Sequence, residues 1–365
     1  MSKRPIYVAA TSQHVGKTTS TLGMVSVLKK KGLNVGYCKP LGQQFVDVGP
    51  SRVDKDALLF SEFMRFELKP SLHSPVILGA GATTAYLDDP AQFHFPNRIL
   101  KASKILEQSH DIVIYEGTGH PGVGSVVNLS NAHVAKMLKA GVVMVVEAGI
   151  GNTIDKLALN LSMFEQQEVP IVGVIINKAK ASKIEKVRYY VEPVLKARGI
   201  RLLGIMPYEE ELGLPIMLAI YKALNGKVVY NEAQLDNKVN HIIAGSLIDR
   251  AELKAFNGLL LVVSFSRFAD ALEKIKKLAL VTDMGNATTP LSGIILNGKG
   301  EVSPTCEAYI QEHKIPVVYS PMDTYEAVIK ISRIEVKINA RTPWKIKKAV
   351  EMFEEHIDLD PILNF

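Results

Sequence analysis

The sequence predicts an α/β fold, in which a parallel sheet flanked by helices is followed by a second, smaller α/β domain. Over the first two hundred residues, apolar runs alternate with amphipathic helical stretches. These runs are apolar throughout rather than at every second residue, which is typical of parallel strands covered by helices on both faces. The chain has 365 residues, more than one core usually supports, so we expect two domains.

The strands of the first sheet are expected at six apolar runs: Ile6–Ala10, Val35–Lys39, Ile112–Tyr115, Val142–Glu147, Ile171–Ile176 and Leu202–Met206. Helix-like segments separate most of these runs. In sheets of this kind ligands bind beyond the carboxyl ends of the strands. The residues that follow each run are therefore the candidates for a functional site.

The first strand is followed by a phosphate-binding loop (P-loop). Residues Thr11–Thr18 read T-S-Q-H-V-G-K-T, and helical apolar spacing follows as far as Lys29-Lys30-Lys31-Gly32. A strand, a tight loop and a helix in this order aim backbone N–H groups and a helix dipole at one point. Lys17 adds a charge there, and Thr18 adds a hydroxyl for Mg²⁺. Thr11 stands where the usual first glycine would be, so the loop is a variant form.

We expect this loop to bind a nucleotide. The residues assigned to nucleotide binding are Gln13, His14, Val15, Gly16, Lys17, Thr18, Thr19 and Asn177. Asn177 closes the fifth strand, and its amide can both donate and accept, which suits the edge of an adenine, although asparagine also commonly ends strands. His14 either donates to the γ-phosphate or points at solvent, and His120, beside Glu116, leaves the same alternatives open.

Other strand ends carry charged residues. Lys39 ends the second strand, and it either meets a phosphate or carboxylate or is a surface lysine at a turn. Asp54 and Asp56 begin a helix, where either could simply be its N-cap. Glu116 lies at the tip of the third strand, a place from which a carboxylate holds Mg²⁺ or orients a water.

The order and separations of these residues resemble those of dethiobiotin synthetase. The likeness runs from about Lys3 to Tyr208 and rests on Lys17-Thr18, Lys39-Pro40, Asp56-Ala57-Leu58, Glu116-Gly117-x-Gly119, Gly151-Asn152 and Asn177. It implies ATP and Mg²⁺ as cofactors, Thr18, Asp56 and Glu116 as metal ligands, and Lys17, Lys39 and Glu116 as catalytic residues. It also implies a carboxylated substrate at Lys39, an adenine contact at Asn177 and a homodimer.

The substrate side of the sequence departs from that family. The run Leu41-Gly42-Gln43-Gln44 replaces the family's serine, and Ser12-Gln13-His14 replaces its acidic loop residue. The nucleotide half matches better. We therefore expect ATP binding, and the departures disfavour dethiobiotin synthesis itself.

A second domain is expected at residues 214–335, after a first domain at 1–213 and before a helical tail at 336–365. Its apolar runs, Gly258–Ser264, Leu291–Asn297 and Ile315–Tyr319, with Ala244-Gly245-Ser246 before them, resemble the layout of the DRTGG domain. The comparable turn reads S-F-S-R-F, so the eponymous letters are not intact. Together the domains resemble the N-terminal regulatory half of long bacterial phosphate acetyltransferases. A catalytic domain would begin about where this chain ends, so acetyl transfer is not expected.

Two classes of function follow from these likenesses. The favoured one is a nucleotide-responsive regulatory module. The alternative is an ATP-dependent ligase-like enzyme that phosphorylates a small carboxylate or carbamate. An amidotransferase like the cobyrinic acid synthases, which share the N-terminal layout, is disfavoured because Cys306 lies in a helical stretch rather than in a strained strand-to-helix turn.

Composition excludes several other classes. The chain is 47% apolar and 22% charged, as in globular proteins, and no apolar run is long enough for a membrane span or a signal peptide. We therefore expect a cytoplasmic protein without a membrane partner. The net charge of +6 comes from scattered lysines, so no nucleic-acid partner is expected. Cys38 and Cys306 form no zinc or disulfide pattern.

Overall fold

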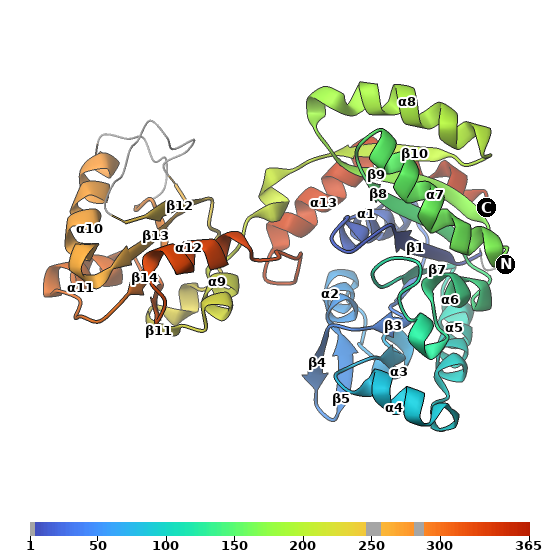
Figure 1. Cartoon of the computed structure of the whole chain (residues 1–365), viewed down its shortest axis with the longest axis horizontal. Coiled ribbons are helices and arrows are strands. Elements are labelled where there is room, and N and C mark those ends of the chain that lie inside the picture. Colours follow the sequence, from blue (N-terminus) through green and yellow to red (C-terminus); the bar gives the residue numbers. More distant parts are fainter. Residues whose placement is uncertain (1–3, 246–256, 281–287) are drawn as a thin grey trace. The chain divides into compact units, whose positions relative to one another are not determined.

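The computed structural model describes residues 4–245, 257–280 and 288–365. The chain divides into two compact units (Figure 1). The phosphate-loop unit comprises Met1–Glu209 together with Ile338–Phe365, and the second unit comprises Glu210–Lys337. The tail that the sequence sets apart thus packs into the phosphate-loop unit, and the expected domain limits at 213 and 335 stay a prediction.

The phosphate-loop unit is built on a six-stranded parallel sheet with the order β10-β9-β8-β1-β7-β2. Each of the six apolar runs of the sequence forms one strand, which confirms the predicted parallel sheet. The strands are β1 (Ile6–Ala10), β2 (Val35–Cys38), β7 (Ile112–Glu116), β8 (Gly141–Glu147), β9 (Ile171–Ala179) and β10 (Leu202–Pro207).

Helices cover both faces of this sheet. Side chains alternate in direction along each strand, so a strand that is apolar throughout buries side chains on both faces. Tyr7 and Ala9 of β1 belong to a core that also contains apolar residues of α5, α6, α7 and α8. On the other face α1 packs against α13, and both contact the sheet. These helices are α1 (Lys17–Lys30), α5 (Phe95–Ser109), α6 (Asn131–Met137), α7 (Gly151–Gln166), α8 (Ile184–Ala197) and α13 (Pro343–His356), with α14 (Asp360–Leu363) at the end of the chain.

Between β2 and β7 the chain forms small elements, among which the sequence analysis expects the helix that begins at Asp54 and Asp56 and assigns none of the others. A hairpin of β4 and β5 leads into α2, and β3 pairs with β6 in a separate short sheet. The elements are β3 (Leu41–Gly42), β4 (Phe45–Val48), β5 (Ser51–Asp54), α2 (Lys55–Met64), α3 (Pro70–His73), β6 (Val76–Ile77) and α4 (Ala82–Asp88). They carry Asp54 and Asp56 to the edge of the main sheet at which β2 and β7 end.

Among its described residues, the second unit contains a five-stranded sheet with the order β11-β15-β14-β13-β12, in which β11 pairs with β15 antiparallel and the other pairings are parallel. Apolar cores lie on both faces of this sheet. The expected runs form β13, β14 and β15, while Ser246 of the expected early turn lies outside the described residues. The elements are α9 (Met217–Leu224), β11 (Lys227–Tyr230), β12 (His241–Ala244), β13 (Leu259–Ser264), α10 (Phe265–Leu280), β14 (Leu291–Asn297), α11 (Pro304–Glu312), β15 (Val317–Ser320) and α12 (Thr324–Ser332).

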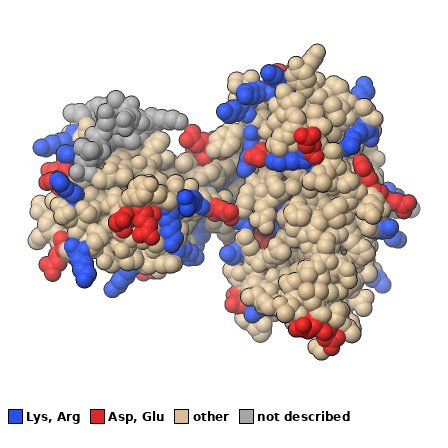
Figure 2. Space-filling model, viewed as in Figure 1, with Lys and Arg blue, Asp and Glu red and all other residues tan. Residues whose placement is uncertain are grey.

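The surface agrees with the scattered charge of the sequence. On the face drawn in Figure 2, lysines and arginines lie among acidic side chains and do not gather into one stripe. Within the described residues, none of the helices has the length and apolar character that crossing a membrane requires.

Candidate functional site

The loop between β1 and α1 has a backbone that few residues other than glycine adopt. Gly16, the N-cap of α1, has a φ of 111°, and a Cβ at this position would lie 2.0 Å from Nδ2 of Asn177. The first turn of α1 holds no acidic residue, and Gly16 makes no side-chain cap. The positive end of the α1 dipole therefore faces the loop without an internal counter-charge on that turn, as an anion site requires.

Lys17 connects the loop to the segment that follows β7. Its Nζ donates to the carbonyl of Gly119 at 2.9 Å and to that of Ser12 at 3.4 Å. The side chain is largely buried. The ammonium is thus held beside the loop by backbone carbonyls, from which it can turn to a phosphate at little cost in desolvation.

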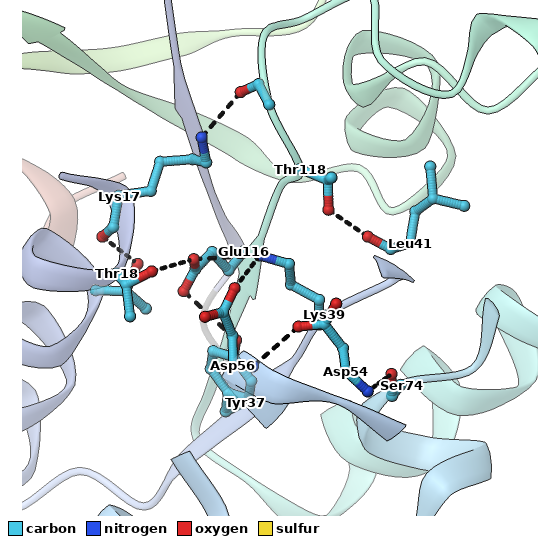
Figure 3. Close-up of polar contacts among 12 residues, drawn as sticks. Lys17, Thr18, Tyr37, Lys39, Leu41, Asp54, Asp56, Ser74, Glu116 and Thr118 are labelled. Carbon is cyan, nitrogen blue, oxygen red and sulfur yellow. Dashed lines mark hydrogen bonds and ion pairs between the residues drawn. The ribbon is translucent and has the colours of Figure 1, made fainter. Parts of the chain in front are cut away.

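Four side chains from separate elements meet beside this lysine, and we call Thr18, Lys39, Asp56 and Glu116 the Lys39 cluster. Nζ of Lys39 donates to Oδ2 of Asp56 at 2.6 Å and to Oε1 of Glu116 at 3.3 Å. Oγ1 of Thr18 donates to the same Oε1 of Glu116 at 3.0 Å (Figure 3). The carboxyl ends of β2 and β7 and the N-termini of α1 and α2 supply these groups, as expected for a parallel sheet.

Burial and charge act in opposite directions on this cluster. Glu116 is fully buried, and desolvation raises the pKa of its carboxyl, while the charge of Lys39 opposes that rise. Burial alone would lower the pKa of Lys39, but the carboxylates of Asp56 and Glu116 outweigh it, so its pKa lies above the ordinary value. Lys39 is therefore a fixed positive charge and not the surface lysine of the alternative interpretation.

The structure separates the roles of the two aspartates. Asp54 is the N-cap of α2, since its Oδ1 accepts from the backbone N–H of Asp56 at 2.9 Å, and it is buried. Asp56 lies in the first turn of α2 and points to Lys39. Of the two, Asp56 is the one that reaches the cluster.

Asn177 lies against the loop. Its Nδ2 donates to the carbonyl of Val15 at 2.8 Å, and its Oδ1 accepts from the backbone N–H of Lys178 at 2.8 Å. The side chain is buried, so in this structure its amide fixes the loop. The contact with adenine stays a prediction.

The remaining residues of the predicted site lie around the loop with differing exposure. Gln13 and His14 are exposed, Val15 is buried and Thr19 is half-buried. His120 is also exposed, and its Nδ1 accepts from the backbone N–H of Gly122 at 3.2 Å. Neither histidine belongs to the Lys39 cluster.

Sequence reasoning missed Tyr37 and Thr118. Oη of Tyr37 donates to Oε2 of Glu116 at 3.4 Å, and the ring stacks on Phe60 with centroids 3.9 Å apart. Oγ1 of Thr118 donates to the carbonyl of Leu41, which ties the β7 loop to β3. Both lie within or directly beside the runs already singled out. The one signal for Tyr37 was a hydroxyl-bearing residue within an otherwise apolar strand.

The donors of the cluster fit Mg²⁺. Two carboxylates and a hydroxyl supply hard oxygen ligands, and an ammonium already lies between the carboxylates. Across the described ranges, no three His, Cys, Asp or Glu side chains gather as a metal-binding group. Such a site matches Mg²⁺ held by one or two carboxylates together with nucleotide phosphates, rather than an all-protein cage.

Comparison with protein families matches both units. The model of the AAA_26 family, described as an AAA domain, matches residues 4–215, and the model of the DRTGG domain matches residues 219–334.

Curated relatives match over nearly the whole chain. Phosphate acetyltransferase of Nitratidesulfovibrio vulgaris is 24% identical over 369 residues, which cover 97% of this chain and 50% of that protein. The phosphate acetyltransferase of Synechocystis is 22% identical and is matched over 51% of its length. A probable cobyric acid synthase of Methanocaldococcus jannaschii is 26% identical over 58% of this chain and 46% of that protein. The chain therefore spans about half the length of the phosphate acetyltransferases it matches.

Solved structures resemble the chain more distantly. The MinD cell division protein of Aquifex aeolicus is 17% identical with a TM-score of 0.37, over 57% of this chain and 84% of that one. A plasmid partition protein of Borrelia burgdorferi, solved with AMPPNP, is 16% identical with a TM-score of 0.39, over 58% and 90% of the two chains.

Proposed function

The chain belongs to the AAA_26 family of AAA domains, and on that premise we propose that it binds ATP with Mg²⁺ as a nucleotide-responsive regulatory module. The N-terminal half of the phosphate acetyltransferases is the relative on which the regulatory part of the proposal rests.

One observation carries the proposal of ATP·Mg²⁺ binding. Lys17 and Lys39, two buried ammonium groups, converge with Thr18, Asp56 and Glu116 beside the N-terminus of α1. A polyphosphate with its metal ion needs this combination of cations, helix dipole and carboxylates.

Each side chain has a separate task in this proposal. Lys17 binds the β- and γ-phosphates, and the backbone N–H groups of the loop and of the first turn of α1 donate hydrogen bonds to the phosphate oxygens. Thr18, Asp56 and Glu116 would hold Mg²⁺, which when bound neutralises phosphate charge. The hydroxyl of Thr11, buried and without a hydrogen-bond partner among the described residues, adds a donor inside the loop.

The regulatory part draws on connectivity. The second unit begins after Glu209 and ends before Ile338, so both of its ends are joined to the phosphate-loop unit. The chain that follows it forms α13, which packs on α1. The helix that begins with Lys17 and Thr18 is thus a direct neighbour of the segment that leaves the second unit.

The binding proposal is tested by calorimetric titration of ATP and of a non-hydrolysable analogue, each with Mg²⁺. We expect Lys17→Ala to weaken binding by about two orders of magnitude, because a charge-assisted contact to phosphate contributes about 1.5–3 kcal/mol per bond. Lys180→Ala, which removes an exposed lysine outside the site, is the matched control. Equal affinity in wild type and Lys17→Ala would contradict the proposal.

A second candidate function is ATP-dependent phosphorylation of a small carboxylate or carbamate. The observation in its favour is the burial of Lys39 beside Lys17, which forms a two-cation clamp of the kind that phosphoryl transfer uses. Phosphate release measured with and without bicarbonate and a diamine separates the candidates. Turnover that requires an acceptor favours the ligase-like enzyme, and tight binding without such turnover favours the regulatory module.

A further inference from the structure

Lys39 lies where a metal ion shared by Asp56 and Glu116 would lie. Its Nζ is 2.6 Å from Oδ2 of Asp56 and 3.3 Å from Oε1 of Glu116, and the side chain is only 5% exposed. One ammonium thus bridges the two carboxylates that the proposed function assigns to Mg²⁺ (Figure 3).

An ammonium and a divalent ion cannot serve the same two oxygens together. Mg²⁺ approaches its oxygen ligands to about 2.0–2.1 Å, inside the space that Nζ of Lys39 fills. Two cations in a buried site also repel each other strongly, because solvent screening there is weak. The carboxylates therefore bind one of the two cations at a time.

A displaced Lys39 needs another anion. An unpaired ammonium in a buried site is costly, so release of Lys39 from the carboxylates is favourable only when a new partner is at hand. A nucleotide phosphate in the loop supplies such a partner beside Lys17 and α1.

We propose that Lys39 is an internal cation that excludes divalent metal from Asp56 and Glu116 until a nucleotide phosphate draws its ammonium away. This inference rests on the proposed function of the site and adds a rule to it: metal and nucleotide bind together, and metal alone binds weakly. The rule prevents the site from holding a free divalent ion in place of a nucleotide.

The test measures Mn²⁺ binding by electron paramagnetic resonance, with and without AMPPNP, in the full chain. In wild type we expect weak Mn²⁺ binding alone and much tighter binding with the nucleotide. In Lys39→Met, which removes the charge and keeps an unbranched side chain one atom shorter, we expect Mn²⁺ alone to bind at least about tenfold tighter than in wild type. Lys101→Met, an exposed lysine of α5, makes the same change of charge outside the site and should behave as wild type.

Two further variants protect the test against a folding defect. Lys39→Gln keeps a polar side chain without the charge and should show the same gain in Mn²⁺ affinity, while Lys39→Arg keeps the charge and should not. Lys39→Met combined with Glu116→Gln removes one of the two carboxylates and should lose the gain. Circular dichroism and thermal unfolding identify the variants that are folded.

The unmodified protein gives an independent readout. In lysine-selective ¹⁵N NMR, the signal of the buried Lys39 ammonium is assigned by its loss in Lys39→Arg. This signal should shift on addition of Mg²⁺ with AMPPNP and stay in place with Mg²⁺ alone. A shift of equal size with Mg²⁺ alone, or Mn²⁺ binding by folded Lys39→Met no tighter than by wild type and Lys101→Met, overturns the inference.

The failure of the inference and the failure of the proposed function look different. If wild type binds no ATP in the presence of Mg²⁺, the proposed function is wrong, whatever Lys39 does. If wild type binds ATP with Mg²⁺ and removal of the Lys39 charge leaves Mn²⁺ affinity unchanged, ATP binding stands and the exclusion by Lys39 is wrong.

Discussion

At the scale of single residues, the position of Gly16, Lys17 and Thr18 between a strand and a helix was predictable from sequence. The hydrogen-bond partners of Lys39 were not. The strand, loop and helix that frame Gly16-Lys17-Thr18 are local, so their pattern is complete within one short stretch. The contact of Lys39 with Asp56 and Glu116 joins three elements. Only the fold brings these together, and the sequence left Lys39 with two interpretations for that reason.

His73 gives a residue-level prediction for stability against pH. Its Nδ1 accepts from the backbone N–H of Lys69 at 3.0 Å, and its ring lies 4.3 Å from that of Phe66. Burial, with a smaller contribution from His110, lowers the pKa of His73 from 6.5 to about 4. The folded state therefore resists a proton that the unfolded state accepts, so folding free energy is lost as pH falls from the unfolded pKa toward the folded one.

Because of His73, we expect the free energy of unfolding to fall by about 1–2 kcal/mol as the pH is lowered from about 6.5 to 4. Each pKa unit corresponds to about 1.4 kcal/mol, and partial solvent contact reduces the effect. Urea unfolding across this range should show a shallower pH dependence in His73→Asn than in wild type. His94→Asn, at an exposed position, should keep the wild-type slope. Parallel slopes in wild type and His73→Asn would refute the assignment.

At the scale of elements, α1 and α13 pack closely against each other. Gly23 of α1 lies so near Phe353 that a Cβ at position 23 would come within 2.1 Å of the Cβ of Phe353. An exposed glycine in a helix costs about 1 kcal/mol relative to alanine, so replacement would normally stabilise α1. At position 23, however, the close packing of α1 on α13 leaves no room for a side chain, so glycine is required.

Gly23→Ala should therefore destabilise the phosphate-loop unit by about 1–3 kcal/mol, the usual cost of overpacking. Gly151→Ala, at the start of α7 with nothing within 4 Å of the added methyl, serves as the control and should be neutral or slightly stabilising. Thermal unfolding of both variants and of wild type measures the effect. A Gly23→Ala variant that unfolds at the wild-type temperature would contradict the packing argument.

The elements also show where sequence reasoning stops. All six strands of the main sheet were predicted because strands buried on both faces are continuously apolar. The hairpin of β4 and β5 was missed, since its two strands are short and their residues are partly exposed and mixed in polarity. The sequence predicted a helical tail at residues 336–365, and α13 lies within it, but its partner α1 lies at the other end of the chain. Amphipathic periodicity shows that a helix buries one face and not which element covers that face.

At the scale of the whole molecule, the phosphate-loop unit is discontinuous in sequence. The segment after Lys337 supplies α13, and the backbone N–H of Asp358 donates to the carbonyl of Leu203 at 2.8 Å, beside β10. Arg4, near the start of the chain, lies 5.3 Å above the ring of Phe365. The segment after Lys337 therefore packs into the first unit, where Phe353, Leu359 and Ile362 are buried.

This discontinuity predicts opposite outcomes for two deletions. A chain that ends at Lys337 loses Phe353, Leu359 and Ile362, which are all buried, and exposes the apolar face of α1, so it should lose cooperative unfolding and nucleotide binding. A chain in which Glu210–Lys337 is replaced by a short Gly/Ser linker keeps every element of the phosphate-loop unit. It should unfold cooperatively and bind ATP with Mg²⁺ within about threefold of the intact protein, because a domain with its own core can fold alone.

Calorimetry and thermal unfolding of the two deletions distinguish a discontinuous first unit from one that is complete before the second unit begins. If the chain that ends at Lys337 unfolds at the wild-type temperature and keeps its affinity, the terminal segment is an appendage and α13 contributes nothing to the phosphate loop. If only the linker variant is folded, then the second unit is an insertion between β10 and α13. Under the proposed regulatory function, α13 is then the element through which the second unit would act on Lys17 and Thr18, because α13 follows that unit in the chain and packs on α1.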